Sequence, residues 1–280
     1  DTTNITYKSI NEALNDICTI QNITLSKHNR LLIRLHPGHY KESIILPSFV
    51  DLEGVNKSSV ILSFNHDLFQ QDYIVKLKSN SSIKNITLLL DNKIIDEKEE
   101  EEEEDETNKM GIYIENENNI LIENIAFIDN NNKYKNILKA IHLYGGYNNH
   151  IKNININLQL GFGKIYGLYL EETIDTQIDK LNLSISSPSN SSYGLYLKNN
   201  KNIDISYSKI IVSIAEYIYG VYNLNSNFTL NNVFFKLNSE FNCCYGIFCL
   251  EEEIKTSDNT KHNYNIILDE TMLYLDDNED

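Results

Sequence analysis

The sequence has no tryptophan and, in 280 residues, only three prolines, four cysteines and two arginines. Both arginines, Arg30 and Arg34, lie early in the chain, and the formal net charge is −16. Proteins hold nucleic acid and anionic membranes through clustered lysine and arginine, so this charge excludes both as expected partners. No apolar run is long enough to cross a bilayer, so no membrane span is predicted.

The four cysteines are Cys18, Cys243, Cys244 and Cys249, and their spacing does not suggest a framework of disulfides or metal ligands. Adjacent cysteines rarely bridge each other, and Cys249 replaces a leucine of the repeat described below, which predicts an inward side chain. A free cysteine commonly behaves as a small buried hydrophobe. We therefore interpret these residues as buried free thiols and expect neither a metal nor a cofactor.

The negative charge is concentrated in one stretch. Ten acids and one lysine lie between Asp96 and Glu106. Like charges repel one another and cannot bury apolar surface, so residues 96–109 are predicted to leave the fold as a disordered acidic insertion.

A short string, Tyr-Gly-Leu-Tyr-Leu, occurs at Tyr166–Leu170 and again at Tyr193–Leu197. Looser copies of its last four residues begin at Gly111, Ala140, Gly220, Gly246 and Met272, so that successive copies start 26 to 29 residues apart. A constant interval in an otherwise irregular sequence indicates that each copy has the same place in a stack of repeats.

A second box follows the first by about eleven residues. Its copies are Ile83–Ile86, Ile122–Ile125, Ile151–Ile154, Ile178–Leu181 and Leu230–Val233. With a third short apolar run, each repeat holds three strands and three turns, which is the size of one β-helix rung. The β-branched, aromatic and asparagine content argues against helices of the same period. Asparagine-rich turns such as 118–119, 148–149, 199–200 and 225–227 are expected to form side-chain ladders along the axis.

The first residues predict a helical cap. Ser9 and Glu12 fit a capping box, and Ile10, Ala13, Leu14 and Ile17 follow at helical spacing. The predicted organisation is one all-β domain over residues 1–280. It comprises a cap region at 1–30, first rungs at 31–95, the acidic insertion at 96–109 and regular rungs at 110–280.

The opening of the chain resembles a known superfamily. The residues that carry the resemblance are Ser9-Ile10 with Ala13-Leu14, then Pro37 to Glu42, Leu52 to Gly54 and Val60-Ile61. They are similar to the start of pectin-lyase-like right-handed parallel β-helix proteins, which include pectin-degrading enzymes, phage tailspikes and virus fibre proteins. The resemblance implies the fold. The Asn-Thr-Asp and Gly-His-Gly elements of its hydrolases, the methylesterase signature and the late catalytic arginine of its lyases are all missing, so no activity carries over.

Strand alternation predicts that Leu168 and Leu170 point inward and Tyr169 outward. Stacking the rungs then aligns one outer strip of aromatic side chains: Tyr113, His142, Tyr169, Tyr196, Tyr222, Phe248 and Tyr274. Such a strip can be a glycan-binding platform, a contact between subunits or with a surface protein, or a self-stacking column that stabilises the coil. All three interpretations stay open at this point.

No catalytic residue is assigned. Glu171, Glu172, Asp175 and Asp204 are the best acids for a tailspike-like hydrolase, and each fits a solvated turn equally well. The sequence favours a non-catalytic structural or adhesive protein, a fibre component of a virion or cell surface with weak glycan binding. The alternative is a polysaccharide lyase, hydrolase or pectin esterase.

Overall fold

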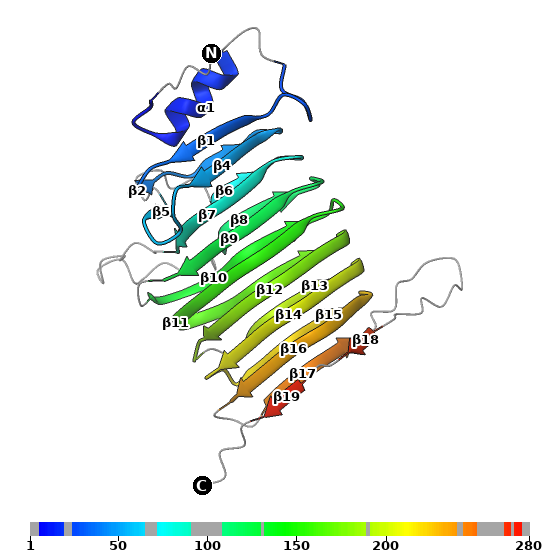
Figure 1. The fold of residues 1–280 in the computed structure, drawn as a ribbon. Coiled ribbons are helices and arrows are strands. Elements are labelled where there is room, and N and C mark those ends of the chain that lie inside the picture. The colour runs from blue at the N-terminus through cyan, green and yellow to red at the C-terminus, as the bar shows by residue number, and fades with distance from the viewer. Residues whose placement is uncertain are drawn as a thin grey trace.

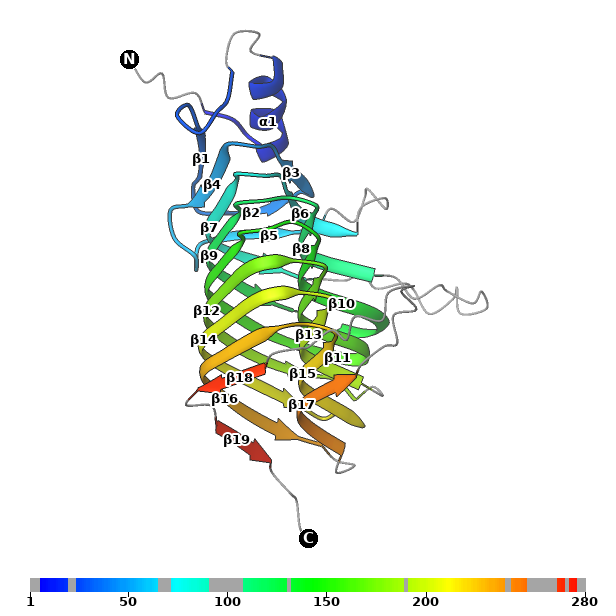
Figure 2. The ribbon, with the colours of Figure 1, turned by 90° about the vertical axis from the view of Figure 1, so that its right-hand side faces the viewer.

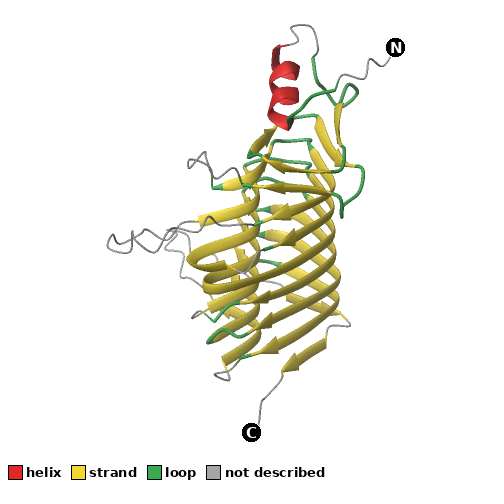
Figure 3. Ribbon diagram, turned by 90° about the vertical axis from the view of Figure 1, so that its left-hand side faces the viewer, coloured by secondary structure: helices red, strands yellow, loops and turns green. Residues whose placement is uncertain are grey.

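The computed structural model describes residues 6–19, 24–64, 72–90, 108–129, 132–188, 191–239, 243–250, 266–269 and 272–275. These residues wind into a parallel β-helix of about six turns with a single helix at its N-terminal end (Figure 1). Figure 3 shows how completely strands dominate the rest of the described chain. The predicted all-β coil with a helical cap is therefore confirmed. The acidic segment 96–107 lies outside the described residues.

The helix α1 (Ile10–Thr19) covers the open end of the coil (Figure 2). The Ser9 hydroxyl accepts a hydrogen bond from the backbone N–H of Glu12 at 3.0 Å, as the predicted capping box requires. The Glu42 carboxylate, from the first coil, accepts the N–H groups of Ile10 and Asn11 at 3.0 and 2.9 Å. A negative charge at a helix N-terminus is favourable, so Glu42 fixes the cap to the coil.

The strands form two walls, both parallel. The wall that we call the tyrosine sheet contains β3 (Ile44–Leu46), β6 (Tyr73–Leu77), β8 (Asn108–Glu115), β10 (Asn132–Tyr144), the second half of β11 (His150–Glu171), β13 (Ser191–Lys198), β15 (Tyr217–Leu224) and β17 (Cys243–Leu250). The wall that we call the bent sheet contains β1 (Leu31–Leu35), β2 (Gly38–Lys41), β4 (Val50–Gly54), β5 (Val60–Ser63), β7 (Ser82–Leu89), β9 (Leu121–Ile128), the first half of β11, β12 (Ile174–Ser186), β14 (Lys201–Ser213), β16 (Phe228–Asn238), β18 (Ile266–Asp269) and β19 (Met272–Leu275).

Each long strand of the bent sheet turns a corner at one residue with positive φ. These corner residues are Asn85, Asn124, Asn153, Lys180, Tyr207 and Asn232, with φ between 48 and 58°. Asparagine adopts this left-handed conformation more readily than most residues, which explains its recurrence in the second sequence box. The side chain of Asn124 donates to Asn85 at 2.6 Å, and that of Asn153 donates to Asn124 at 3.0 Å. The corner divides the bent strand into two arms, so the predicted three strands per coil are confirmed. The predicted turn ladders are confirmed by separate bonds, from Asn148 to Asn119 at 2.7 Å and from Asn225 to Asn199 at 3.4 Å.

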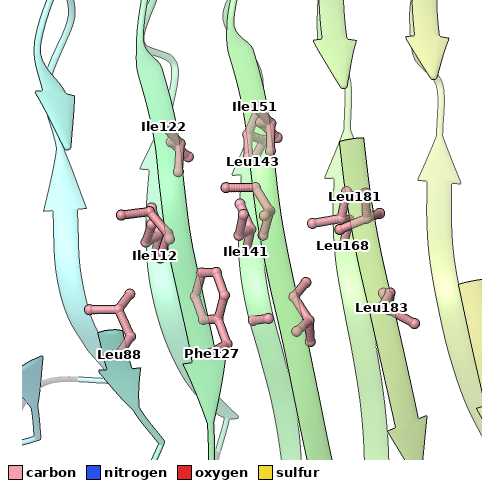
Figure 4. Packing of buried hydrophobic residues seen from close by; sticks show 14 of the residues in the cluster. Leu88, Ile112, Ile122, Phe127, Ile141, Leu143, Ile151, Leu168, Leu181 and Leu183 are labelled. Carbon is pink, nitrogen blue, oxygen red and sulfur yellow. The ribbon is translucent and has the colours of Figure 1, made fainter. Parts of the chain in front are cut away.

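Aliphatic side chains fill the interior between the two walls (Figure 4). Leu168 pairs with Ile141 in one neighbouring coil and with Leu195 in the other, and all three are fully buried. Residues such as Leu183 and Phe127 project into the same interior from the bent sheet. Burial of each such side chain contributes roughly 1.5–3 kcal/mol, so this continuous core holds the coil together.

The strict alternation of inward and outward residues breaks at the glycine of the repeated string. In β13, both Gly194 and Leu195 are buried, while Tyr193 before them and Tyr196 after them lie on the outer face. The glycine faces a large side chain of the bent sheet across the interior, Ile210 in this coil. Two tyrosines three residues apart therefore share one face of the sheet.

We expect Gly194→Ala to lower the free energy of unfolding by about 2 kcal/mol, because overpacked cores lose stability on that scale. The new Cβ would lie 2.7 Å from the Gly220 carbonyl oxygen and 2.7 Å from the Ile210 Cγ2 atom. Gly38→Ala is the matched control, since its Cβ would meet nothing closer than the Tyr40 ring at 3.5 Å. Urea unfolding measures both; equal stabilities of the two variants would show that the interior has room for the methyl group.

One predicted repeat is in the wrong wall. Tyr274 was assigned to the outer strip, but β19 pairs with β16 in the bent sheet, with Tyr274 opposite Lys236. The 26-residue interval is coincidental, because the stretch from Leu250 to Ile266 takes 16 residues where Leu224 to Phe228 takes four. The longer connection shifts the phase of the pattern by half a coil.

Candidate functional site

The other six predicted strip residues lie in one column on the outer face of the tyrosine sheet. They are Tyr113, His142, Tyr169, Tyr196, Tyr222 and Phe248, each in register with the next. Successive ring centroids are 5.3, 4.7, 4.5, 5.3 and 5.2 Å apart. The rings from Tyr169 to Phe248 are stacked, with interplanar angles of 12, 6 and 24°. The predicted column is confirmed for these residues.

A second aromatic column, absent from the sequence prediction, runs beside the first. It consists of Tyr166, Tyr193, Tyr219 and Tyr245, stacked at 4.7, 5.0 and 5.1 Å. Rings of the two columns meet edge to face, as Tyr193 and Tyr196 do at 5.7 Å and 85°. The sequence signal for this second column is the first tyrosine of Tyr-Gly-Leu-Tyr-Leu, but strict alternation of inward and outward residues would turn that side chain inward.

The stacking determines what this aromatic face, meaning both columns together, presents to its surroundings. The stacked rings within each column cover one another's flat faces, which leaves their edges for contact with a ligand. Burial raises the pKa of Tyr219 to about 12, and it also raises the pKa of Tyr169. The hydroxyls of these two residues therefore stay protonated, and that of Tyr169 donates to Glu171. Stacked and edge-to-face pairs each add about 0.5–1.5 kcal/mol beyond area burial, so self-stacking also stabilises the coil.

The N-terminal end of the aromatic face is different in chemistry. In the second column, Lys139 takes the place of a tyrosine, in register with Tyr166, and Met110 precedes it. Together with Asp72, Tyr73, Asn108, Tyr113 and His142 they line a hollow of about 360 Å³. The Lys139 ammonium lies 4.1 Å from the Tyr169 ring centroid and 5.8 Å from that of Tyr166.

His142 is held neutral at this end. Burial, and to a smaller extent the charge of Lys139, lowers its pKa to about 3. Its Nδ1 lies 3.2 Å from the Met110 sulfur, and because sulfur here can only accept, the proton belongs on Nδ1. The buried Nε2 then carries a lone pair with no hydrogen-bond partner among the described residues.

Two of the acids proposed from the sequence, Glu171 and Asp175, already have partners, and the third, Glu172, lies in a turn. Glu171 forms an ion pair with Lys198 at 2.9 Å and accepts the Tyr169 hydroxyl at 3.3 Å. Asp175 accepts from the Asn202 side chain at 2.9 Å, and Glu172 occupies a turn position with φ of 57°. These three candidates therefore serve turns and ladders of the coil.

The fourth acid, Asp204, lies on the opposite wall. A second hollow of about 360 Å³ on the bent sheet is lined by His150, Ile151, Lys152, Gln177, Ile178, Asp179, Asp204 and Ser206. Asp204 is in register with Gln177, and Asp179 with Ser206, whose hydroxyl donates to Asp179 at 3.2 Å. The two aspartates are diagonal neighbours on adjacent rungs, a relation that brings side chains within reach of one ligand.

Metal ligands and thiols add no site within the described parts of the chain. No group of three or more histidine, cysteine, aspartate or glutamate side chains there could hold a metal ion. Cys243, Cys244 and Cys249 form no disulfide, and the Cys249 sulfur lies 3.8 Å from the Asn223 amide. Cys249 is exposed, and Cys243 and Cys244 are partly exposed, because β17 is the last described strand of its sheet; the prediction that these thiols are buried is wrong. The side chain of Cys18 lies outside the described set.

Among the described residues there is no helix of the length and apolarity that a membrane crossing requires.

No protein-family model matches the chain, and no curated protein does. Solved structures similar to it include a pectin methylesterase in complex with a hexasaccharide, at 10% identity and a TM-score of 0.49 over 94% of this chain and 90% of that one. Pectin methylesterase PemA from Erwinia chrysanthemi matches at 7% identity and 0.41, over 94% and 96%. The Dettilon tailspike protein matches at 10% identity and 0.35, over 86% and 62%. The fold assignment rests on the parallel register of the chain itself.

Proposed function

We propose that this protein is a non-catalytic structural or adhesive β-helix, placed at the surface of a virion or cell. The observation that carries the proposal is the aromatic face, whose two stacked columns run through successive coils. Such a ladder stiffens the rod and repeats one chemical pattern along it. The ion pair of Glu171 with Lys198 supports the non-catalytic interpretation, because a carboxylate held by a lysine is not poised to transfer a proton.

The adhesive contact that fits this face is weak and spread over several rungs. Because ring faces are covered, a glycan would meet aromatic edges and hydroxyl groups and would exchange hydrogen bonds with them. The same face suits a contact with a second copy of the chain or with another surface protein, since tyrosine is enriched at interfaces. We place the glycan first because hydroxyl rows at a spacing of about 5 Å offer repeated polar contacts.

The test removes the hydroxyls and keeps the rings. In a Tyr193→Phe, Tyr196→Phe, Tyr219→Phe variant, the stacking should persist, as Phe248 shows by stacking on Tyr222 at 5.2 Å. We expect at least a tenfold loss of retention on a glycan array, with an unchanged urea midpoint. Unchanged retention would exclude contact through the hydroxyl edges.

A second candidate is a polysaccharide hydrolase, favoured by Asp179 and Asp204 in the hollow on the bent sheet. Paired carboxylates can act as acid and base on a glycosidic bond. A reducing-sugar release assay on the glycans retained by the array decides between the two. If the protein releases reducing sugar and the Asp179→Asn and Asp204→Asn variants do not, the hydrolase proposal replaces the adhesive one.

A further inference from the structure

Several lysines around the aromatic face have carboxylate partners among the described residues. Lys76 pairs with Glu115 at 2.8 Å, Lys78 with Glu117 at 2.9 Å and Lys198 with Glu171 at 2.9 Å. No carboxylate among the described residues lies within ion-pair distance of Lys139. Its side chain is partly buried, and this withdrawal from water lowers the pKa of the amine. A half-buried cation without a counter-charge is unfavourable by itself.

The neighbours of Lys139 do not supply the missing charge. Asp72 lines the same hollow, but it pairs with Lys109 at 3.4 Å, so these two charges balance. Glu171 contributes only a longer-range attraction. His142 is neutral for the reasons given above. The lining therefore carries one uncompensated positive charge, held in place by the Tyr169 and Tyr166 rings.

The remaining lining is suited to an organic ligand. The Asn108 amide can donate hydrogen bonds to a ligand, whereas the Tyr113 hydroxyl is engaged with Glu115; Tyr73 and Met110 supply apolar surface. At about 360 Å³, the hollow is at the lower end of the range for small-molecule sites. It lies where the aromatic face ends, and there the ring of Tyr113 is contacted by the Lys76 ammonium, 4.8 Å from its centroid, and by the ring of Tyr73, 6.1 Å away between centroids.

From these contacts we propose that the hollow at the N-terminal end of the aromatic face binds a carboxylate group, with Lys139 as its counter-charge and Asn108 as a hydrogen-bond donor. The carboxylate can be a free small acid or part of a larger ligand. The proposal does not depend on glycan adhesion: the site can exist on a protein whose aromatic face binds no sugar.

The experiment measures dissociation constants by ligand-observed NMR for three probes, acetate, glucuronate and glucose. Glucuronate and glucose differ by the carboxylate, and acetate carries the carboxylate without the sugar. We expect glucuronate to bind at least tenfold more tightly than glucose. If acetate binds as tightly as glucuronate, the carboxylate alone is sufficient. If acetate binds more weakly, the sugar is part of the ligand. Both results support a carboxylate site.

Two lysine variants assign the effect. Lys139→Met keeps an apolar side chain like that of Met110 on the preceding rung, and it should weaken glucuronate binding at least tenfold while leaving glucose unchanged. Lys78→Met is the control, because Lys78 already has Glu117 as its partner and does not line the hollow; it should change binding less than twofold. Equal affinity for glucuronate and glucose in the natural chain, or a preference that survives Lys139→Met in a folded variant, would overturn the proposal.

Discussion

Replacing Asn200 by alanine is expected to lower the free energy of unfolding by about 4 kcal/mol, because several buried partners lose their hydrogen bonds together. The Asn200 side-chain oxygen accepts from the Thr173 N–H and hydroxyl, both at 2.9 Å. Its amide donates to the Leu170 carbonyl at 2.9 Å and to the Ser226 hydroxyl at 3.1 Å. Each buried group left unpaired costs about 1–3 kcal/mol, and all of these residues are buried.

Asn182→Ala is the matched control for that prediction. Asn182 is an exposed asparagine of β12 whose amide makes a single described bond, to Asn155 at 3.1 Å, and its loss should change stability by less than about 0.5 kcal/mol. Urea unfolding followed by far-UV circular dichroism measures both variants. If Asn200→Ala were no more destabilised than Asn182→Ala, water would have to replace the side chain, and the turn would not depend on it.

Acidification should destabilise the protein through His142. The folded-state pKa of this residue is about 3, against about 6.5 for an unfolded chain. The unfolded chain therefore binds a proton first, and the stability that neutral His142 provides is complete above pH 6.5 and declines as the pH falls toward 3. At pH 4.5 the loss attributable to this residue is about 3 kcal/mol, since each unit of difference corresponds to about 1.4 kcal/mol.

A His142→Tyr variant isolates that contribution. Tyrosine fills the same column elsewhere, and it does not titrate in acid. Carboxylates titrate in both proteins, so their effect cancels when the change from pH 7.5 to pH 4.5 is compared between the two. Urea unfolding should show the natural chain losing about 3 kcal/mol more than the variant. The same loss in both would mean that His142 becomes protonated in the folded state.

Much of the fold could be predicted because each coil repeats the same pattern of inward, outward and corner residues. The interval of the Gly-Leu-Tyr-Leu string places Leu168 beside Leu195, and the left-handed asparagine of the second box marks the corner. The prediction for Tyr274 failed because a long connection after β17 displaced the phase, and interval counting cannot detect that the following strand belongs to the other wall.

The functional features were less predictable because they depend on departures from the repeat. Strict alternation would turn Tyr166 inward, and only the paired inward residues Gly167 and Leu168 bring it onto the outer face. Lys139 stands at a tyrosine position, but its missing counter-charge depends on which carboxylates the neighbouring rungs have already engaged. Such pairings are set by register across coils rather than by neighbours in sequence.

Each coil contains one full set of equivalent positions, and this limits how the chain can change in length. Tyr193 and Tyr219 are 26 residues apart and occupy equivalent places in neighbouring coils. The residues between them make up one complete coil. A gain or loss of one complete coil leaves the neighbouring coils with equivalent partners. A gain or loss of a single residue inside a strand instead turns the inward side chains of that strand outward and its outward side chains inward. Length in such a protein is quantised, and evolution can alter its reach by duplication without redesigning any single rung.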